Sequence, residues 1–187
     1  LKALIDECHH HTSFKGLVSY YSIELDETLL LWSLKTTLPF LELSKKEIPE
    51  LTWYEGIFHN IHIRIFLGDG RQTLPKAHSL KLLNPFNAIF QDAFSPKKNP
   101  TLWSVEWFEF LKKMSESNVQ LSTYSSSISI RKSMLASGWT LESAKGFALK
   151  KTMTKATLKG VTSTELLDQL KRSPSLEIRD ISITLNK

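Results

Sequence analysis

Apolar and polar residues alternate along this chain in a way that predicts successive strands and helices. Ile61, Ile63 and Ile65 alternate with polar His62 and Arg64, which is the period of a half-buried strand. Strands are predicted at residues 16–25, 59–67, 86–91 and 119–124. Helical periodicity is found at residues 1–11, 26–38, 101–115 and 128–136. A succession of strands and helices of this kind predicts an α/β fold.

The remaining segments carry weaker patterns. Residues 39–56 form a polar connector with Pro49, and we expect a short helix around Trp53. Residues 139–144 and 148–158 predict an antiparallel hairpin that closes the main body, residues 1–160. Residues 161–187 form a C-terminal extension. In it we expect a helix capped by Ser163 or Thr164 and a final strand at residues 176–185.

Composition bounds the class of protein. With 187 residues, 41% hydrophobic and 23% charged, the chain suits one globular domain. A net charge of +5 permits a polyanionic partner such as RNA, although it is equally a solubility feature. The single Cys8 fits a reducing, cytoplasmic compartment. No apolar run approaches the roughly 20 residues of a membrane span, so we expect no membrane partner. His9 to His11 cannot share one helix face, and we predict no metal.

Three carboxylates follow three predicted strands. Glu24 ends the first, Asp69 lies between Gly68 and Gly70 after the second, and Asp92 follows the third. In open α/β sheets, ligands bind beyond the carboxyl ends of the strands, so we expect one shared crevice. A carboxylate also accepts hydrogen bonds from a ribose diol. The alternatives are that Glu24 and Asp92 serve as helix-terminus charges or caps and that residues 68–70 form a plain glycine turn.

A basic loop follows Asp92 and supplies the remaining candidates. It is punctuated by prolines and carries Lys97 and Lys98, with the alternative that both are solvated surface residues. Further cations are expected near a ligand mouth at Arg131 and Lys132, and on the closing hairpin at Lys150, Lys151 and Lys155. Such lysines fit contacts to nucleic-acid phosphates, although a lysine run is also typical of a solvated face.

These motifs resemble a known family. FNAIFQDAFSPKKNPTLW at residues 86–103, VQLSTYSSSISIRKSMLASGW at 119–139 and GFALKKTM at 146–153 are similar to the methyltransferase domain of the tRNA 5-methylaminomethyl-2-thiouridine biosynthesis enzymes. The family pattern is matched by Asp92, Phe94, Lys97, Asn99, Pro100 and Trp103. The resemblance spans residues 16–158. It implies a Rossmann-like class I methyltransferase, with a mostly parallel sheet and a C-terminal antiparallel hairpin.

The resemblance also implies a cofactor, a partner and roles for individual residues. The cofactor is S-adenosyl-L-methionine, and the partner is the anticodon arm of tRNA. Glu24 matches the ribose-binding acid and Asp69 the acid near the adenine. The implied cofactor-binding set is Glu24, Gly68, Asp69, Gly70 and Asp92. Asp92 is the implied catalytic residue, because a carboxylate binds an ammonium group and helps its proton leave. The implied substrate contacts are Phe94, Lys97, Asn99, Arg131 and Lys150.

Some departures from the family pattern are informative. The family's glycine-rich segment belongs before the first helix, and nothing before Leu1 supplies it, so we expect that the sequence lacks its true amino terminus. Asp92-Ala93-Phe94 stands where the family usually has Asp-Gly-Phe. We expect no flavin-binding oxidoreductase half, so the chain resembles the stand-alone form. Two alternatives stay open: an aminopropyltransferase of the spermidine synthase type and a non-catalytic RNA-binding module.

Overall fold

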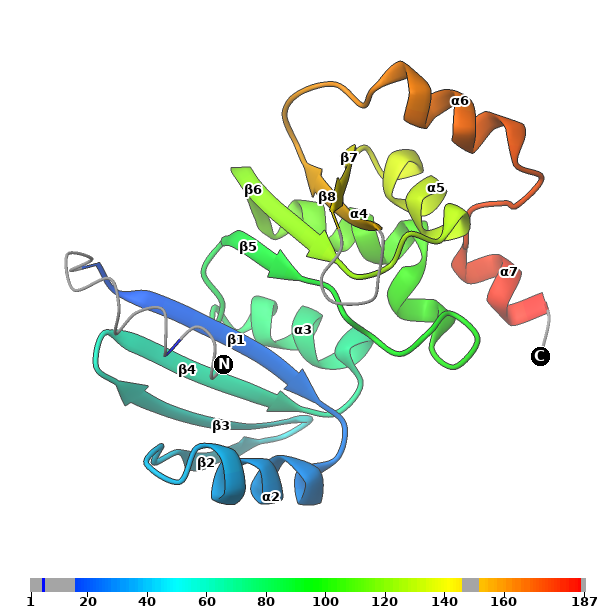
Figure 1. Cartoon of the computed structure of the whole chain (residues 1–187). Helices are drawn as coiled ribbons and strands as arrows, with labels where there is room; N and C mark the ends of the chain where they lie inside the picture. The colour runs from blue at the N-terminus through cyan, green and yellow to red at the C-terminus, as the bar shows by residue number, and fades with distance from the viewer. Residues whose placement is uncertain (1–4, 6–15, 146–151, 186–187) are drawn as a thin grey trace. The chain divides into compact units, whose positions relative to one another are not determined.

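The computed structural model describes residue 5 and residues 16–145 and 152–185 (Figure 1). These residues form two compact units, Leu1–Asn84 and Pro85–Lys187, and each unit has its own four-stranded sheet. The predicted helix at residues 1–11 and its histidines lie almost wholly outside the described residues. Ile5 is described, and its side chain is buried in the core of the first unit.

The sheet of the first unit has the strand order β1-β4-β3-β2. Its strands are β1 (Val18–Glu24), β2 (Ser44–Ile48), β3 (Leu51–Phe58) and β4 (Ile61–Leu67). Only β1 and β4 run parallel, whereas the β4–β3 and β3–β2 pairs are antiparallel. Ile61, Ile63 and Ile65 are buried with Leu30 of helix α2 (Glu27–Thr37) in one core cluster. Phe66 lies on the opposite face of the sheet, because successive strand side chains alternate, and its ring is tilted against that of Trp53 with the centroids 6.5 Å apart.

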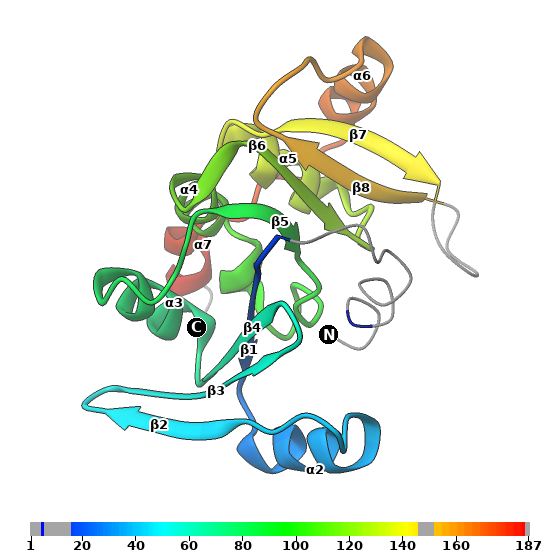
Figure 2. The same cartoon turned by 90° about the vertical axis from the view of Figure 1, so that its left-hand side faces the viewer.

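The sheet of the second unit has the order β5-β6-β8-β7. Its strands are β5 (Phe86–Phe90), β6 (Ser115–Thr123), β7 (Thr140–Lys145) and β8 (Thr152–Thr157). The β5–β6 pair is parallel, and β8 lies antiparallel to both β6 and β7, as Figure 2 shows for the β7–β8 pair. The helices are η1 (Pro100–Trp103), α4 (Val105–Lys113), α5 (Ile128–Ala136), α6 (Thr164–Arg172) and α7 (Asp180–Leu185). Trp139 fixes the core by donating its indole N–H to the Phe108 carbonyl at 3.0 Å.

Each sheet ends in a strand that is paired along one side. Among the described residues β1 pairs with β4 alone, and β5 pairs with β6 alone. The sequence of β5, FNAIF, is typical of a buried parallel strand, yet Phe90 is 85% exposed. Within the described part of the chain, each sheet therefore ends in a strand that is paired on one side, and its neighbour there is parallel to it.

The structure confirms an α/β fold and corrects the expected strand directions. Of the six strand pairs among the described residues, two are parallel, so the prediction of a mostly parallel sheet is wrong. The expected short helix around Trp53 is also wrong, because residues 44–58 form the β2–β3 hairpin. The hairpin turns at Pro49 and Glu50, and Glu50 has a φ of 66°. The strands of this hairpin take part in two of the three strand pairings of the first sheet, β2–β3 and β3–β4, and both are antiparallel.

The C-terminal extension differs from its prediction in one element. The α6 helix is present, and the Ser163 hydroxyl caps it by accepting from the Leu166 N–H. The expected strand at residues 176–185 is wrong, because α7 starts at Asp180. The extended residues before α7 hydrogen-bond to the first turn of α4 and to α5 instead of to a sheet edge. An alternating pattern alone did not distinguish these two outcomes.

Candidate cofactor and substrate sites

Two of the three predicted carboxylates, Glu24 and Asp69, lie at the carboxyl ends of neighbouring strands in the first unit. Glu24 is in register with Leu67, because β1 and β4 are parallel. The Gly68 N–H donates to the Glu24 carbonyl at 2.9 Å, which fastens the turn after β4 to the end of β1. The side chain of Glu24 and the Gly68-Asp69-Gly70 turn are therefore neighbours at the carboxyl ends of two parallel strands, where ligands of α/β proteins bind.

The Glu24 carboxylate is oriented by the backbone that follows it. Its Oε1 accepts from the N–H groups of Leu25, at 2.8 Å, and Asp26, at 3.1 Å. Its Oε2 has no hydrogen-bond partner among the described residues. Asp26, and not Glu24, caps α2 by accepting from the Leu29 N–H. Asp26 is therefore the cap, Glu24 also lies where a charge complements the helix dipole, and one Glu24 oxygen is left to accept from a ligand hydroxyl.

Asp69 has a structural role in the same turn. It is the N-cap of α3 (Gly70–Ser79), and its Oδ1 accepts from the Arg71 N–H at 2.9 Å. This helix was not among the predicted elements, because Pro75 and a polar sequence obscure its period. Gly68 has a φ of 115°, and a Cβ there would lie 3.1 Å from the Thr73 methyl. The turn thus combines a helix cap with a backbone conformation that favours glycine.

The third carboxylate, Asp92, belongs to the second unit. It is exposed just beyond β5, and no hydrogen bond to it is made by the described residues. The preceding Gln91 is buried, where its amide donates to the Leu102 carbonyl at 2.8 Å. Gln91 also accepts from the Trp107 indole at 3.4 Å. An anchored residue therefore holds Asp92 at a fixed point while its carboxylate stays open to solvent.

The loop after Asp92 is held in one shape by its own backbone. The Trp103 indole N–H donates to the Phe94 carbonyl at 2.6 Å, and the Lys98 and Asn99 N–H groups both donate to the Ser95 carbonyl. The Asn99 side chain accepts from the Thr101 hydroxyl. The Phe94 ring is 73% exposed, and the Lys98 ammonium lies 5.8 Å from its centroid. Phe94 and Lys97 are thus presented on the surface, whereas Asn99 helps to close the loop.

The structure places Arg131 in the interior of the second unit. It is 4% exposed, and its guanidinium donates to the Thr154 and Ser143 hydroxyls and to the Met153 carbonyl. Burial lowers the pKa of this guanidinium from its usual value. A side chain with these partners packs α5 against the β7–β8 pair, which argues against the predicted phosphate contact. Lys150 lies outside the described residues.

Two further expectations concern metals and membranes. Among the described residues no group of three or more His, Cys, Asp or Glu side chains is arranged to hold a metal ion. Within the same part of the chain, no helix has both the length and the apolar character needed to cross a membrane.

A comparison with known families assigns the chain to a class of methyl-transferring enzymes. Residues 43–159 match a family described as S-adenosyl-L-methionine-dependent methyltransferase, and the chain belongs to that family. Its cofactor is therefore S-adenosyl-L-methionine, as the resemblance implied. The family's methyl transfer also separates the chain from the aminopropyltransferase alternative.

Particular relatives are similar to parts of this chain. The bifunctional tRNA 5-methylaminomethyl-2-thiouridine biosynthesis protein MnmC of Leptospira interrogans is 33% identical over 114 residues, which are 61% of this chain and 17% of that protein. An uncharacterized protein of Methanocaldococcus jannaschii is 28% identical over 72% of this chain and 38% of its own length. The matched segment spans about a sixth of the length of these MnmC proteins.

A solved structure supports the same fold. The crystal structure of MnmC2 from Aquifex aeolicus superposes with a TM-score of 0.59 at 24% identity, and the match covers 90% of this chain and 64% of that one. At this level of identity the likeness concerns the fold. It includes segments beyond residue 159, where the family match ends.

The first unit fits the nucleoside part of the cofactor. The unpartnered Oε2 of Glu24 is an acceptor suited to a ribose hydroxyl, and the turn at Gly68 allows close backbone approach. Neither Glu24 nor the turn at Gly68 is suited to the methionine part of the cofactor. The sequence did not indicate that Gln91 anchors Asp92, because a buried glutamine within an apolar run leaves no periodic pattern.

Proposed function

We propose that this protein transfers a methyl group from S-adenosyl-L-methionine to the aminomethyl group of a modified wobble uridine, 5-aminomethyl-2-thiouridine, in tRNA. The observation that carries the proposal is Asp92. It is an exposed carboxylate without a partner among the described residues, on a loop that also presents Phe94 and Lys97. The names of the MnmC relatives support this substrate.

The chemistry explains why a carboxylate is needed. S-adenosyl-L-methionine, when bound, supplies a methyl carbon made electrophilic by its sulfonium. A substrate aminomethyl group is mostly protonated in water and has no lone pair to donate. Asp92 accepts an N–H of that ammonium, orients it and assists loss of the proton, either to its own carboxylate or to water. With that proton removed, the amine would have the lone pair that methyl transfer requires.

The surface around Asp92 suits an RNA partner. The exposed ring of Phe94 is a stacking surface for an unstacked base, as aromatic side chains often are in single-stranded RNA sites. The exposed Lys97 and Lys98 provide phosphate contacts. We assign these roles to the loop alone and leave out Arg131, whose donors are used inside the protein.

The test is an Asp92→Asn substitution, which keeps the shape of the side chain and removes its charge. We expect methyl transfer to tRNA from a strain lacking this modification activity to fall at least about a hundredfold. The affinity for S-adenosyl-L-methionine, measured by calorimetry, should stay within about twofold, because the asparagine keeps the size of the side chain and the proposed contact to the ribose is made by Glu24. The matched control is Asp168→Asn, since Asp168 is exposed on α6.

Two results would count against the proposal. One is unchanged turnover in the Asp92→Asn variant, which would remove Asp92 from the catalytic role. The other is failure of the unaltered protein to methylate hypomodified tRNA while it binds the cofactor, which would point to another acceptor.

A further inference from the structure

The second unit contains a pocket, and Lys97 is the one predicted site residue among the described residues that lines it. It has a volume of about 480 Å³. Three separate segments form it: the loop after Asp92, the start of α5, and the chain between α6 and α7. Its lining residues are Ser95, Pro96, Lys97, Pro100, Ser127, Ser129 and Ile178. Ile178 lies beyond the family match, which ends at residue 159, so the C-terminal extension completes the pocket.

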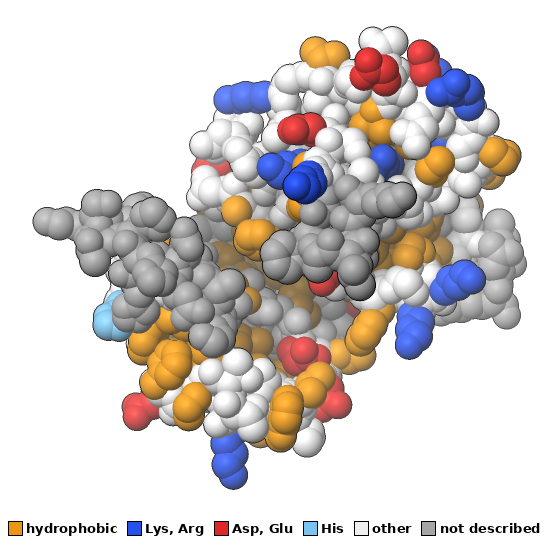
Figure 3. Space-filling view, in the orientation of Figure 1, with side chains coloured by type: hydrophobic (Ala, Val, Ile, Leu, Met, Phe, Trp, Pro, Cys, Tyr) orange, Lys and Arg blue, Asp and Glu red, His pale blue; other side chains and the backbone are white. Residues whose placement is uncertain are grey.

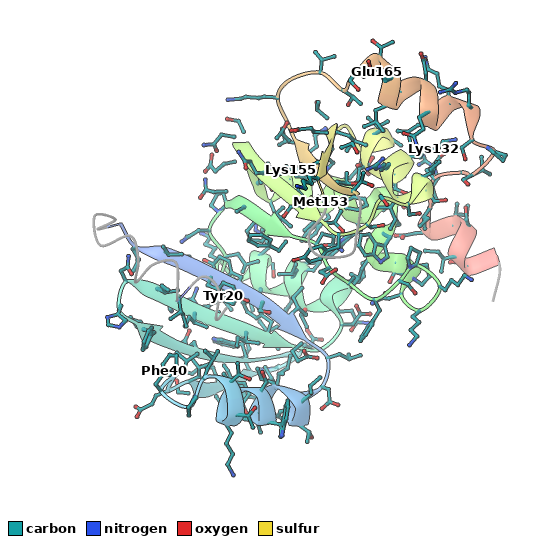
Figure 4. The ribbon with its side chains drawn as sticks, viewed as in Figure 1. Tyr20, Phe40, Lys132, Met153, Lys155 and Glu165 are labelled. Atoms are coloured by element: carbon teal, nitrogen blue, oxygen red, sulfur yellow. The ribbon has the colours of Figure 1, made fainter. Side chains whose placement is uncertain are left out.

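The segment that carries Ile178 is held firmly in place. We call residues 173–180 the C-terminal strap. The Lys132 ammonium donates to the Ser173 and Ser175 carbonyls at 2.9 and 2.7 Å (Figure 4). Both backbone polar groups of Ile178 are paired, since its N–H donates to the Ser133 hydroxyl and its carbonyl accepts from the Val105 N–H, each at 2.8 Å.

The last residues of the strap are anchored on α4. The Asp180 N–H donates to a Glu106 carboxylate oxygen at 3.0 Å, and the Arg179 guanidinium lies 3.9 Å from the other oxygen of the same group. Anchors on both sides of Ile178 therefore fix its side chain against the pocket. The strap is a preformed wall of the pocket, because its backbone hydrogen bonds do not depend on a ligand.

The lining of the pocket combines apolar, cationic and hydroxyl-bearing side chains. Pro96, Pro100 and Ile178 offer rigid apolar surface, and Lys97 offers a single positive charge. Three serines add hydroxyls, and the Ser127 hydroxyl is not used to cap α5. The described residues contribute no carboxylate to the lining. A nucleotide combines a flat, largely apolar base with an anionic phosphate, so it complements both parts of this lining.

We propose that this pocket binds one nucleotide of the RNA substrate, next to the nucleotide that is methylated. Pro96, Pro100 and Ile178 contact its base or ribose, and Lys97 pairs with its phosphate. Ser95 follows Asp92 by three residues, a span of at most about 10 Å, so the pocket and the carboxylate serve adjacent nucleotides. The inference rests on the proposed function, because it takes RNA as the substrate.

The experiment compares two residues of the strap. Ile178→Glu replaces the apolar wall by a carboxylate that repels a phosphate. Leu176→Glu makes the same change two residues away, at a side chain that is 75% exposed and does not line the pocket. Binding is measured by fluorescence anisotropy with a labelled anticodon stem-loop RNA. We expect Ile178→Glu to raise the Kd about tenfold and Leu176→Glu to change it less than about twofold.

Further measurements separate misfolding and the failure of the proposed function from failure of the inference. Ile178→Ala keeps the backbone anchors and should give a smaller increase in Kd in the same direction. Cofactor affinity should be equal in all variants. Equal Kd values for Ile178→Glu and Leu176→Glu would overturn the inference and leave the proposed function intact. RNA binding that depends on Ile178, without methylation of that RNA, would support the pocket and contradict the proposed reaction. No binding of RNA by the unaltered protein would overturn both.

Discussion

Single residues decide which predicted roles hold, and Glu24 is the clearest test. We expect Glu24→Gln to weaken S-adenosyl-L-methionine binding about tenfold or more, because a carboxylate accepts a stronger hydrogen bond from a hydroxyl than an amide does. Calorimetry measures the change. Glu47→Gln is the matched control, since Glu47 is exposed on β2. Equal affinities in the two variants would place the ribose elsewhere.

Arg131 makes the opposite prediction, of a role inside the fold. We expect Arg131→Leu to lower the free energy of unfolding by about 2–3 kcal/mol, because the Thr154 and Ser143 hydroxyls lose a buried partner. Chemical denaturation measures the loss, with the exposed Arg172→Leu as control. If the Arg131→Leu protein were fully stable and bound RNA more weakly, the predicted role of Arg131 as a phosphate contact would be supported instead.

Residue patterns alone located Glu24, Asp69 and Asp92 at strand ends, because a strand followed by an acidic turn is a local signal. They did not separate Arg131 from Lys132. The two cations are adjacent in sequence, yet one enters the interior and the other reaches the C-terminal strap. Which way a helix residue faces depends on what packs against it, and here that includes β8 and residues 173–175, both distant in the chain.

At the scale of elements, the strap offers a prediction about Lys132. Lys132→Met keeps an apolar side chain of similar length but removes the two bonds to the strap. We expect faster tryptic cleavage after Arg172 and a raised KM for tRNA, with kcat and cofactor affinity nearly unchanged.

Lys113→Met is the control for this change, because Lys113 is exposed in the last turn of α4. Lys132 acts only through the strap, so cleavage and KM should change together. A raised KM with a strap as resistant to trypsin as in the unaltered protein would mean that Lys132 contacts the RNA directly.

Elements with a strong period were predicted well, and those with a weak one were not. The regular alternation of β4 and the hydrophobic face of α4 are local properties, so both were found. The β2–β3 hairpin was missed because β2 is SKKEI, whose side chains are all exposed, and only pairing with β3 identifies it as a strand. The α7 helix was missed because its apolar residues also fit a strand period.

At the scale of the whole molecule, some large apolar side chains are exposed at the surface. Figure 3 shows hydrophobic side chains gathered over α2, where Leu29, Leu31 and Trp32 are exposed together with the preceding Leu25. The mean hydropathy of −0.18 gives no sign of this. The helix was predicted from its period, but which of its leucines would be exposed depended on packing against the first sheet.

β1 and β5 each have one edge that no described strand pairs, and this has a consequence for how the chain behaves in solution. A strand edge without a neighbour presents backbone donors and acceptors that another polypeptide can satisfy. We therefore expect the 187-residue chain to self-associate as its concentration rises, through strand addition and not through its charged surface. Sedimentation velocity over a concentration series would reveal this, and added salt should not reverse it. A monodisperse monomer at every concentration would mean that both edges are protected.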